Sequence, residues 1–132
     1  MKFNHYYKEL DLCEKDFPFE QYEDICDRNK EDEEGFCDCE FFSLDYSLAL
    51  HIYGRLRYFQ DHCLYGHPAY MTADQWENIL KKMIKGFKLY LQEEEINYTL
   101  SDKEKINISK NRRKQINYGF RLFIKYFSHL WY

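Results

Sequence analysis

The residues of this chain best suited to chemistry are its cysteines and histidines, which are common zinc ligands and nucleophiles. They form two candidate groups along the sequence. One is Cys37 and Cys39 with Cys26 upstream, and the other is His62, Cys63 and His67. Structural zinc sites usually combine two halves with Cys-x2–4-Cys or His-x3–5-His spacing. Cys37-x-Cys39 is one residue too tight, the histidine pair has no matching half, and neither group carries a signature of a catalytic cysteine. We therefore expect reduced thiols, no bound metal, no cofactor and no enzymatic activity.

A basic run is the second group of candidate residues, and it consists of Lys110, Arg112, Arg113 and Lys114. Four cations within five residues could hold phosphate groups, and the ring of Tyr98 or Tyr118 could stack on a base. The alternative is a solvated helix face without a ligand. A sequence pI near 5.7 argues against a dedicated duplex DNA-binding protein, because such proteins usually carry a basic excess.

Acidic residues near the N-terminus are the third group, and they form a candidate partner-binding surface: Glu31, Asp32, Glu33, Glu34, Asp38 and Glu40. Residues 1–45 hold 15 Asp/Glu against 5 Lys/Arg, a net charge of −10, whereas residues 46–132 have a net charge of +6. Spaced carboxylates on a surface can occupy a basic groove that is meant for nucleic acid. The alternative is that these charges only keep the protein soluble.

Size and composition restrict the architecture that positions these groups. A chain of 132 residues is long enough for one domain, and its aromatic content of 20% lets few large side chains build a core. Only 5 Gly and 2 Pro interrupt it, which favours long helices. No apolar run approaches the roughly 18 residues that span a bilayer, and the N-terminus does not resemble a secretory signal. We expect a single soluble, intracellular, all-α domain over residues 1–132.

Hydrophobic periodicity predicts three main helices near residues 44–64, 72–92 and 112–131, after an acidic and less regular segment 1–40. Thr72 and Gln75 have the spacing of a capping box at the start of the second helix. Ser101 and Glu104 have the same spacing, and a polar helical turn or two should follow them. Apolar residues in 3- and 4-residue steps indicate the core-facing stripes. In the last helix this stripe is Ile116, Phe120, Phe123, Phe127 and Leu130.

Two segments together resemble a known group of proteins. One runs from Leu44-Asp45-Tyr46 through Gly66-His67-Pro68 to Trp76-x-x-Ile79-Leu80-x-x-Met83-Ile84-x-x-Phe87, and the other is the aromatic stretch from Gly119 to Trp131. The combination is similar to small uncharacterised helical proteins of tailed bacteriophages and prophages, over about half the chain. The chain departs from that pattern at Arg55, where a proline is expected, and in its acidic, Cys-rich N-terminal part. The resemblance implies a shared fold and a phage origin, and it implies no catalytic residue.

Small phage proteins without catalytic motifs commonly act by binding. The leading functional hypothesis is therefore a non-enzymatic inhibitor of a host antiviral defence effector, for example an anti-CRISPR protein, acting through protein–protein contact in the cytoplasm of the infected bacterium. Three alternatives stay open: an oligomeric sponge for a nucleotide signal, a nucleic-acid-binding accessory of phage replication, and a virion component. A membrane partner is not expected.

Overall fold

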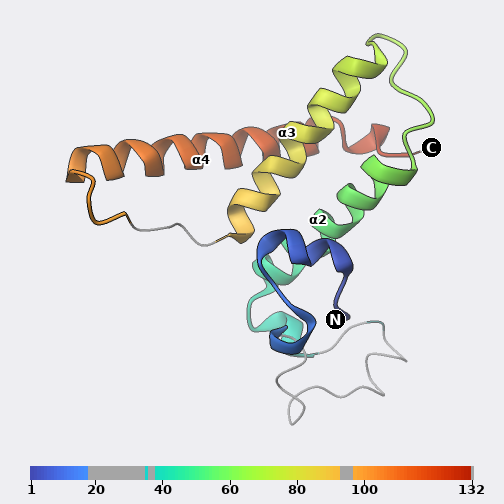
Figure 1. Ribbon diagram of the computed structural model, residues 1–132. Helices are drawn as coiled ribbons and strands as arrows, with labels where there is room; N and C mark the ends of the chain where they lie inside the picture. Colours follow the sequence, from blue (N-terminus) through green and yellow to red (C-terminus); the bar gives the residue numbers. More distant parts are fainter. Residues whose placement is uncertain (18–34, 36–37, 93–96, 132) are drawn as a thin grey trace. The chain divides into compact units, whose positions relative to one another are not determined.

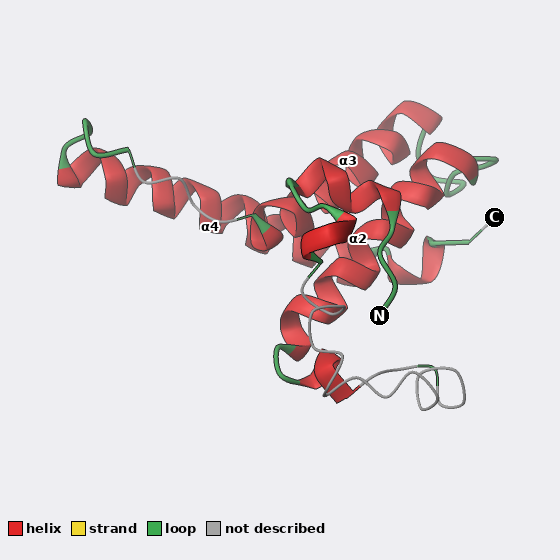
Figure 2. Ribbon diagram, turned by 60° about the horizontal axis from the view of Figure 1, so that its bottom comes forward, coloured by secondary structure: helices red, strands yellow, loops and turns green. Residues whose placement is uncertain are grey.

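The computed structural model describes residues 1–17, 35, 38–92 and 97–131, and this part of the chain is all-α, as predicted (Figure 1). Its main helices are α2 (Leu44–His62), α3 (Ala73–Leu91) and α4 (Asp102–Lys125). Short 3-10 helices accompany them: η1 (His5–Leu10), η2 (Glu14–Asp16), η3 (Asp38–Phe41) and η4 (Phe127–His129). Figure 2 shows no strand among the described residues. None of the described helices is long and apolar enough to cross a membrane.

The chain divides into two compact units, Met1–Gly54 and Arg55–Tyr132, and the division falls within α2. In the first unit, η1 and the start of α2 build a small aromatic core. Phe17 is fully buried, and its ring stacks on that of Tyr7 with centroids 5.6 Å apart. The buried hydroxyl of Tyr53 donates a 2.6 Å hydrogen bond to Oε2 of Glu9, which ties α2 to η1. The prediction of a single domain over residues 1–132 stays a prediction.

One face of α2 differs from expectation. Leu44, Leu48 and Tyr58 widen the apolar surface of this helix in the sequence, and burial on two sides is the natural expectation. Their exposed fractions are 43%, 51% and 53%, so this second face lies open among the described residues. The buried face of α2 is broader than one stripe, because Leu50 and Ser47 are buried together with Ala49, Tyr53 and Leu56. The helix ends at His62, close to the predicted end near residue 64.

The start of α3 is specified by local chemistry, and the prediction for it is confirmed. The Thr72 hydroxyl accepts from the Gln75 amide at 3.2 Å, and the Gln75 side-chain oxygen accepts from the Thr72 amide at 2.9 Å. This capping box satisfies two of the amides that a helix leaves without partners in its first turn. Most of the apolar stripe that the 3- and 4-residue steps predict for this helix is buried: Trp76, Leu80, Met83, Ile84 and Phe87. Ile79 is of intermediate burial, and Tyr90, which was also assigned to the stripe, is exposed.

The bounds of α4 differ from the predicted helix at 112–131. The helix begins at Asp102, where the Ser101 hydroxyl accepts from the Glu104 amide at 3.2 Å. The polar turns after Ser101 therefore belong to the same helix as the apolar stripe. At the other end the helix stops at Lys125, and the chain continues through Tyr126 into η4.

Helices α3 and α4 cross in contact through two glycines, Gly86 and Gly119 (Figure 1). A Cβ atom built on Gly119 would lie 2.7 Å from the Gly86 Cα and 3.0 Å from the Lys82 carbonyl oxygen. A Cβ atom on Gly86 would lie 2.8 Å from the Gly119 Cα. Real side chains do not tolerate such distances to backbone atoms, so only glycine permits this crossing. The two residues bring neighbouring aromatic rings of both helices together.

The core around this crossing contains most of the expected aromatic residues. Phe87 is buried, and its ring lies 4.7 Å from Phe120 and 5.2 Å from Phe123, measured between centroids. The assignment of Phe127 to this core is wrong, because its side chain is 63% exposed. Since α4 ends at Lys125, the helical step that would carry Phe127 inward is broken. The residues of the last segment that are buried are Gly119, Leu122 and Tyr126.

Candidate functional site

A basic groove runs along α4 and is the candidate binding site of the second unit. Its volume is about 880 Å³, and it is lined by α4 residues between Lys105 and Phe120 together with Tyr90 near the end of α3. Its cationic members are Lys105, Lys110, Arg112 and Arg113. No acidic residue lines it, in the part of the chain that the structure describes. We call this feature the α4 groove.

Helical geometry explains why these residues lie together. Lys105, Ser109, Arg112 and Ile116 follow one another in 3- and 4-residue steps, so they share one face of α4. With a rise of about 1.5 Å per residue, the cations from Lys105 to Arg113 extend over roughly 12 Å. That length accommodates more than one phosphate group.

Arg112 has a structural task in addition to its place in the groove. Its Nη2 donates to the carbonyl oxygens of Leu89 and Gln92, at the C-terminal end of α3. The last carbonyls of a helix have no partner within the helix, and they carry partial negative charge that a guanidinium stabilises. The half-buried Arg112 side chain therefore joins the end of α3 to the middle of α4. The same side chain is one of the lining residues of the groove.

The other basic residues are held less tightly. Lys110, Arg113 and Lys114 are exposed, and Lys114 does not line the groove. Helix α4 carries eight Lys/Arg and only two Asp/Glu, a net charge of +6. Both acidic residues, Asp102 and Glu104, lie in its first turn, where negative charge favours the helix N-terminus. The positive charge is therefore concentrated beyond that turn, along the groove.

The aromatic residues at the groove are not those that the sequence suggested. Tyr98 and Tyr118 do not line it; the Nζ atoms of Lys105 and Lys82 lie 5.5 and 5.8 Å from their respective ring centroids. Tyr90 and Phe120 line the groove instead, with ring centroids 5.5 Å apart. Tyr90 was predicted only as part of the inner stripe of its helix. Its side chain is 37% exposed at the groove, which the periodicity of its own helix could not show.

Most of the predicted acidic surface falls outside the described residues. This applies to Glu31, Asp32, Glu33 and Glu34, and the side chain of Asp38 is also not described. Glu40 is described and half-buried, and its Oε2 lies 3.5 Å from the N-terminal ammonium of Met1. This carboxylate is therefore engaged within the first unit.

The predicted metal ligands are only partly described. Cys26 and Cys37 lie outside the described residues, as does the side chain of Cys39. Among the described side chains, no cluster of three or more His, Cys, Asp or Glu is placed to hold a metal ion. Cys63 is a free thiol of intermediate burial.

Comparison of the chain with protein-family models, with curated proteins and with solved structures finds no match. The resemblance to phage proteins therefore stays a prediction, and the function has to be inferred from the geometry.

Proposed function

We propose that this chain is a non-enzymatic binding protein whose α4 groove binds single-stranded nucleic acid. The observation that supports the proposal is the row of cations beside Tyr90 and Phe120, on a surface to which no described residue contributes a carboxylate. Proteins that bind single strands combine a positive groove for the phosphates with aromatic rings on which bases stack. The predicted role of a nucleic-acid-binding accessory is the hypothesis that this geometry favours.

Each part of the groove has a role in this proposal. Lys105, Lys110 and Arg113 neutralise successive phosphates, and the pair of Tyr90 and Phe120 offers a stacking surface for a base. Arg112 holds the end of α3 beside α4, so that the aromatic pair stays next to the cations. The side-chain amide of Asn117 and the hydroxyl of Ser109 also line the groove and add uncharged polar groups to it.

The experiment compares two charge-matched triple variants by fluorescence anisotropy with a labelled single-stranded oligonucleotide. One variant carries Lys105→Gln, Lys110→Gln and Arg113→Gln in the groove. The other carries Lys81→Gln, Lys82→Gln and Lys85→Gln on the exposed face of α3, outside the groove. For single strands each phosphate contact contributes about 0.7 to the slope of log K against log salt, so the groove variant should lower the slope by about 2.

The α3 variant should retain most of the wild-type affinity and slope. Equal weakening by both variants would show that general charge, and not the groove, attracts the oligonucleotide. A duplex of the same sequence should compete less well than the single strand. If the wild type does not bind single strands at low salt, the proposal is wrong.

We propose a second role, inhibition of a host antiviral defence effector through an acidic surface. This proposal is based on the net charge of −10 that residues 1–45 carry. Reversal of Glu31, Asp32, Glu33 and Glu34 to lysine should abolish inhibition of DNA cleavage by a CRISPR effector without unfolding the protein. Inhibition should also weaken with salt, because exposed charges are screened within about 8–10 Å. Inhibition that survives this reversal would exclude the acidic surface.

A further inference from the structure

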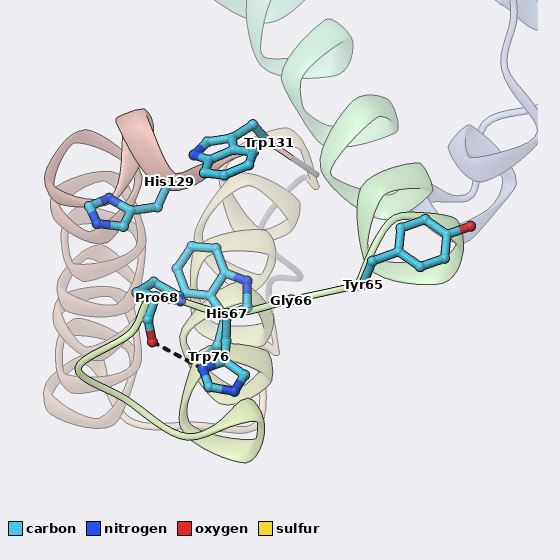
Figure 3. Close-up of a pocket in the computed structure, with 7 residues that line it drawn as sticks. All are labelled: Tyr65, Gly66, His67, Pro68, Trp76, His129 and Trp131. Atoms are coloured by element: carbon cyan, nitrogen blue, oxygen red, sulfur yellow. Dashed lines mark hydrogen bonds between the residues drawn. The ribbon is translucent and has the colours of Figure 1, made fainter.

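A second cavity lies at the other end of the α3–α4 pair and shares no lining residue with the α4 groove (Figure 3). Its volume is about 280 Å³, and it is formed by the loop before α3, the first turn of α3 and the segment after α4. Its walls include Gly66, His67, Pro68, Trp76, His129 and Trp131. Tyr65 also borders it, but its ring is turned away from the two indoles in Figure 3. We call this cavity the indole pocket.

The two tryptophans of the indole pocket differ in exposure: Trp76 is buried and Trp131 is exposed. The Trp76 side chain is only 2% exposed, and its ring packs against Tyr126 at a centroid distance of 5.9 Å. Trp131 is 75% exposed. A flat ring that enters the pocket can cover the Trp131 indole while Trp76 forms the floor. The gain is burial of apolar surface together with ring stacking.

The polar groups of the pocket define what such a ring must carry. His67 Nδ1 lies 3.0 Å from the Pro68 carbonyl oxygen. A carbonyl oxygen can only accept, so Nδ1 bears the proton in this hydrogen bond. In the neutral imidazole Nε2 is then an acceptor, and it has no partner among the described residues.

His129 has a different role. Its Nε2 lies 3.3 Å from the Tyr70 hydroxyl and its Nδ1 lies 3.3 Å from the Ser128 hydroxyl, so both ring nitrogens already have partners. The His129 ring is therefore held in place and only lines the pocket, whereas His67 can accept a hydrogen bond from the ligand.

We propose that the indole pocket binds a flat heteroaromatic ring with an exocyclic N–H donor, a purine base being the chemistry that fits. The ring stacks on Trp131, and its amino group donates to His67 Nε2. A volume of about 280 Å³ lies at the lower limit of small-molecule sites, which accommodates one ring system. An organic cation fits less well, because two imidazoles line the pocket and no carboxylate of the described residues does.

The two tryptophans of the chain both line this pocket, so intrinsic indole fluorescence reports on it alone. Adenosine should quench this emission saturably when the indoles are excited at the red edge of their absorption. His67→Leu keeps both indoles and removes the acceptor, and it should weaken adenosine binding at least about tenfold, as should loss of a stacking ring in Trp131→Leu. Tyr98→Leu, a matched change of an exposed ring outside the pocket, should leave binding unchanged.

Circular dichroism checks that each variant is folded. Absence of saturable quenching by millimolar adenosine would overturn the proposal, and so would saturable binding of tetramethylammonium in its place. Equal affinity in the wild type and in folded His67→Leu would also overturn it. The groove variant with Lys105→Gln, Lys110→Gln and Arg113→Gln should bind adenosine as the wild type does, so this test is independent of the one for the α4 groove.

Discussion

The two halves of α4 belong to one continuous helix and have opposite surroundings. The C-terminal half, from Ile116 on, packs on α3 through Gly119 and Leu122. In the N-terminal half all residues from Asp102 to Asn111 are exposed except Lys105, which is of intermediate burial. We call residues from Ile116 to Lys125 the packed half and residues from Asp102 to Asn111 the free half. Backbone hydrogen bonds continue from the packed half into the free half and so extend the helix.

This difference separates stability from binding within one element. The packed half provides apolar burial, whereas the free half provides charge on a rigid support. Substitutions should therefore change the free energy of unfolding in one half and ligand affinity in the other. The four predictions that follow test this separation, from the largest expected effect on stability to the smallest.

Phe87→Ala should have the largest effect, because this buried ring contacts both Phe120 and Phe123 of the packed half. Removal of a buried aromatic side chain costs about 3–5 kcal/mol in the free energy of unfolding. Urea denaturation followed by circular dichroism measures it. An unchanged urea midpoint would mean that α3 and α4 are not held together by these rings.

Gly119→Ala should destabilise through overpacking, since its Cβ would meet the Gly86 Cα. Overpacking costs about 1–3 kcal/mol and is partly offset by the gain of up to about 1 kcal/mol in helix propensity. Gly66→Ala is the control, because nothing lies within 4 Å of its added Cβ. Adding Gly86→Ala to Gly119→Ala should cost less than the sum of the two single effects, since one methyl group already separates the helices. A stabilised Gly119→Ala would exclude the close crossing.

Arg112→Gln should lower the free energy of unfolding by about 1–2 kcal/mol, because two charge-assisted hydrogen bonds to the end of α3 are lost at a half-buried position. Arg113→Gln is the neighbouring control. Its exposed side chain should contribute less than about 0.5 kcal/mol to stability but should contribute to oligonucleotide binding. Thermal unfolding of the two variants compares them directly, and equal losses would contradict a capping role for Arg112.

Ile108→Ala should have the smallest effect, because this residue of the free half is 50% exposed and does not line the groove. Its change in the free energy of unfolding should stay within about 0.5 kcal/mol. A loss comparable to that of Phe87→Ala would show that the free half is covered in solution. Sedimentation velocity would then distinguish self-association from a contact within the chain.

Features that depend on neighbouring residues could be predicted from the sequence. The capping box at Thr72 and Gln75 and the cap at Ser101 need only three-residue spacing. The continuity of the polar turns after Ser101 with the last helix was missed, because the free half of α4 lacks apolar periodicity. The helix crossing was missed because two glycines offer no hydrophobic signal, and Phe127 was misassigned because the periodicity does not show that α4 ends at Lys125. Three cations of the groove, Lys110, Arg112 and Arg113, were predicted as part of a basic run, whereas Lys105 was missed because it lies outside that run. The roles of Arg112 and Tyr90 depend on the packing of α3 against α4.

Amide hydrogen exchange along α4, measured by mass spectrometry with and without a single-stranded oligonucleotide, tests the separation of the two halves most directly. Without oligonucleotide, amides before Arg113 should exchange much faster than those between Ile116 and Lys125, because packed helix opens only in larger unfolding events. Oligonucleotide should slow exchange most in the free half, with a smaller effect around Phe120, whose ring lines the groove, and none toward Lys125. Uniform protection along α4 in the free protein, or protection by oligonucleotide on the lysine face of α3 instead, would contradict the account.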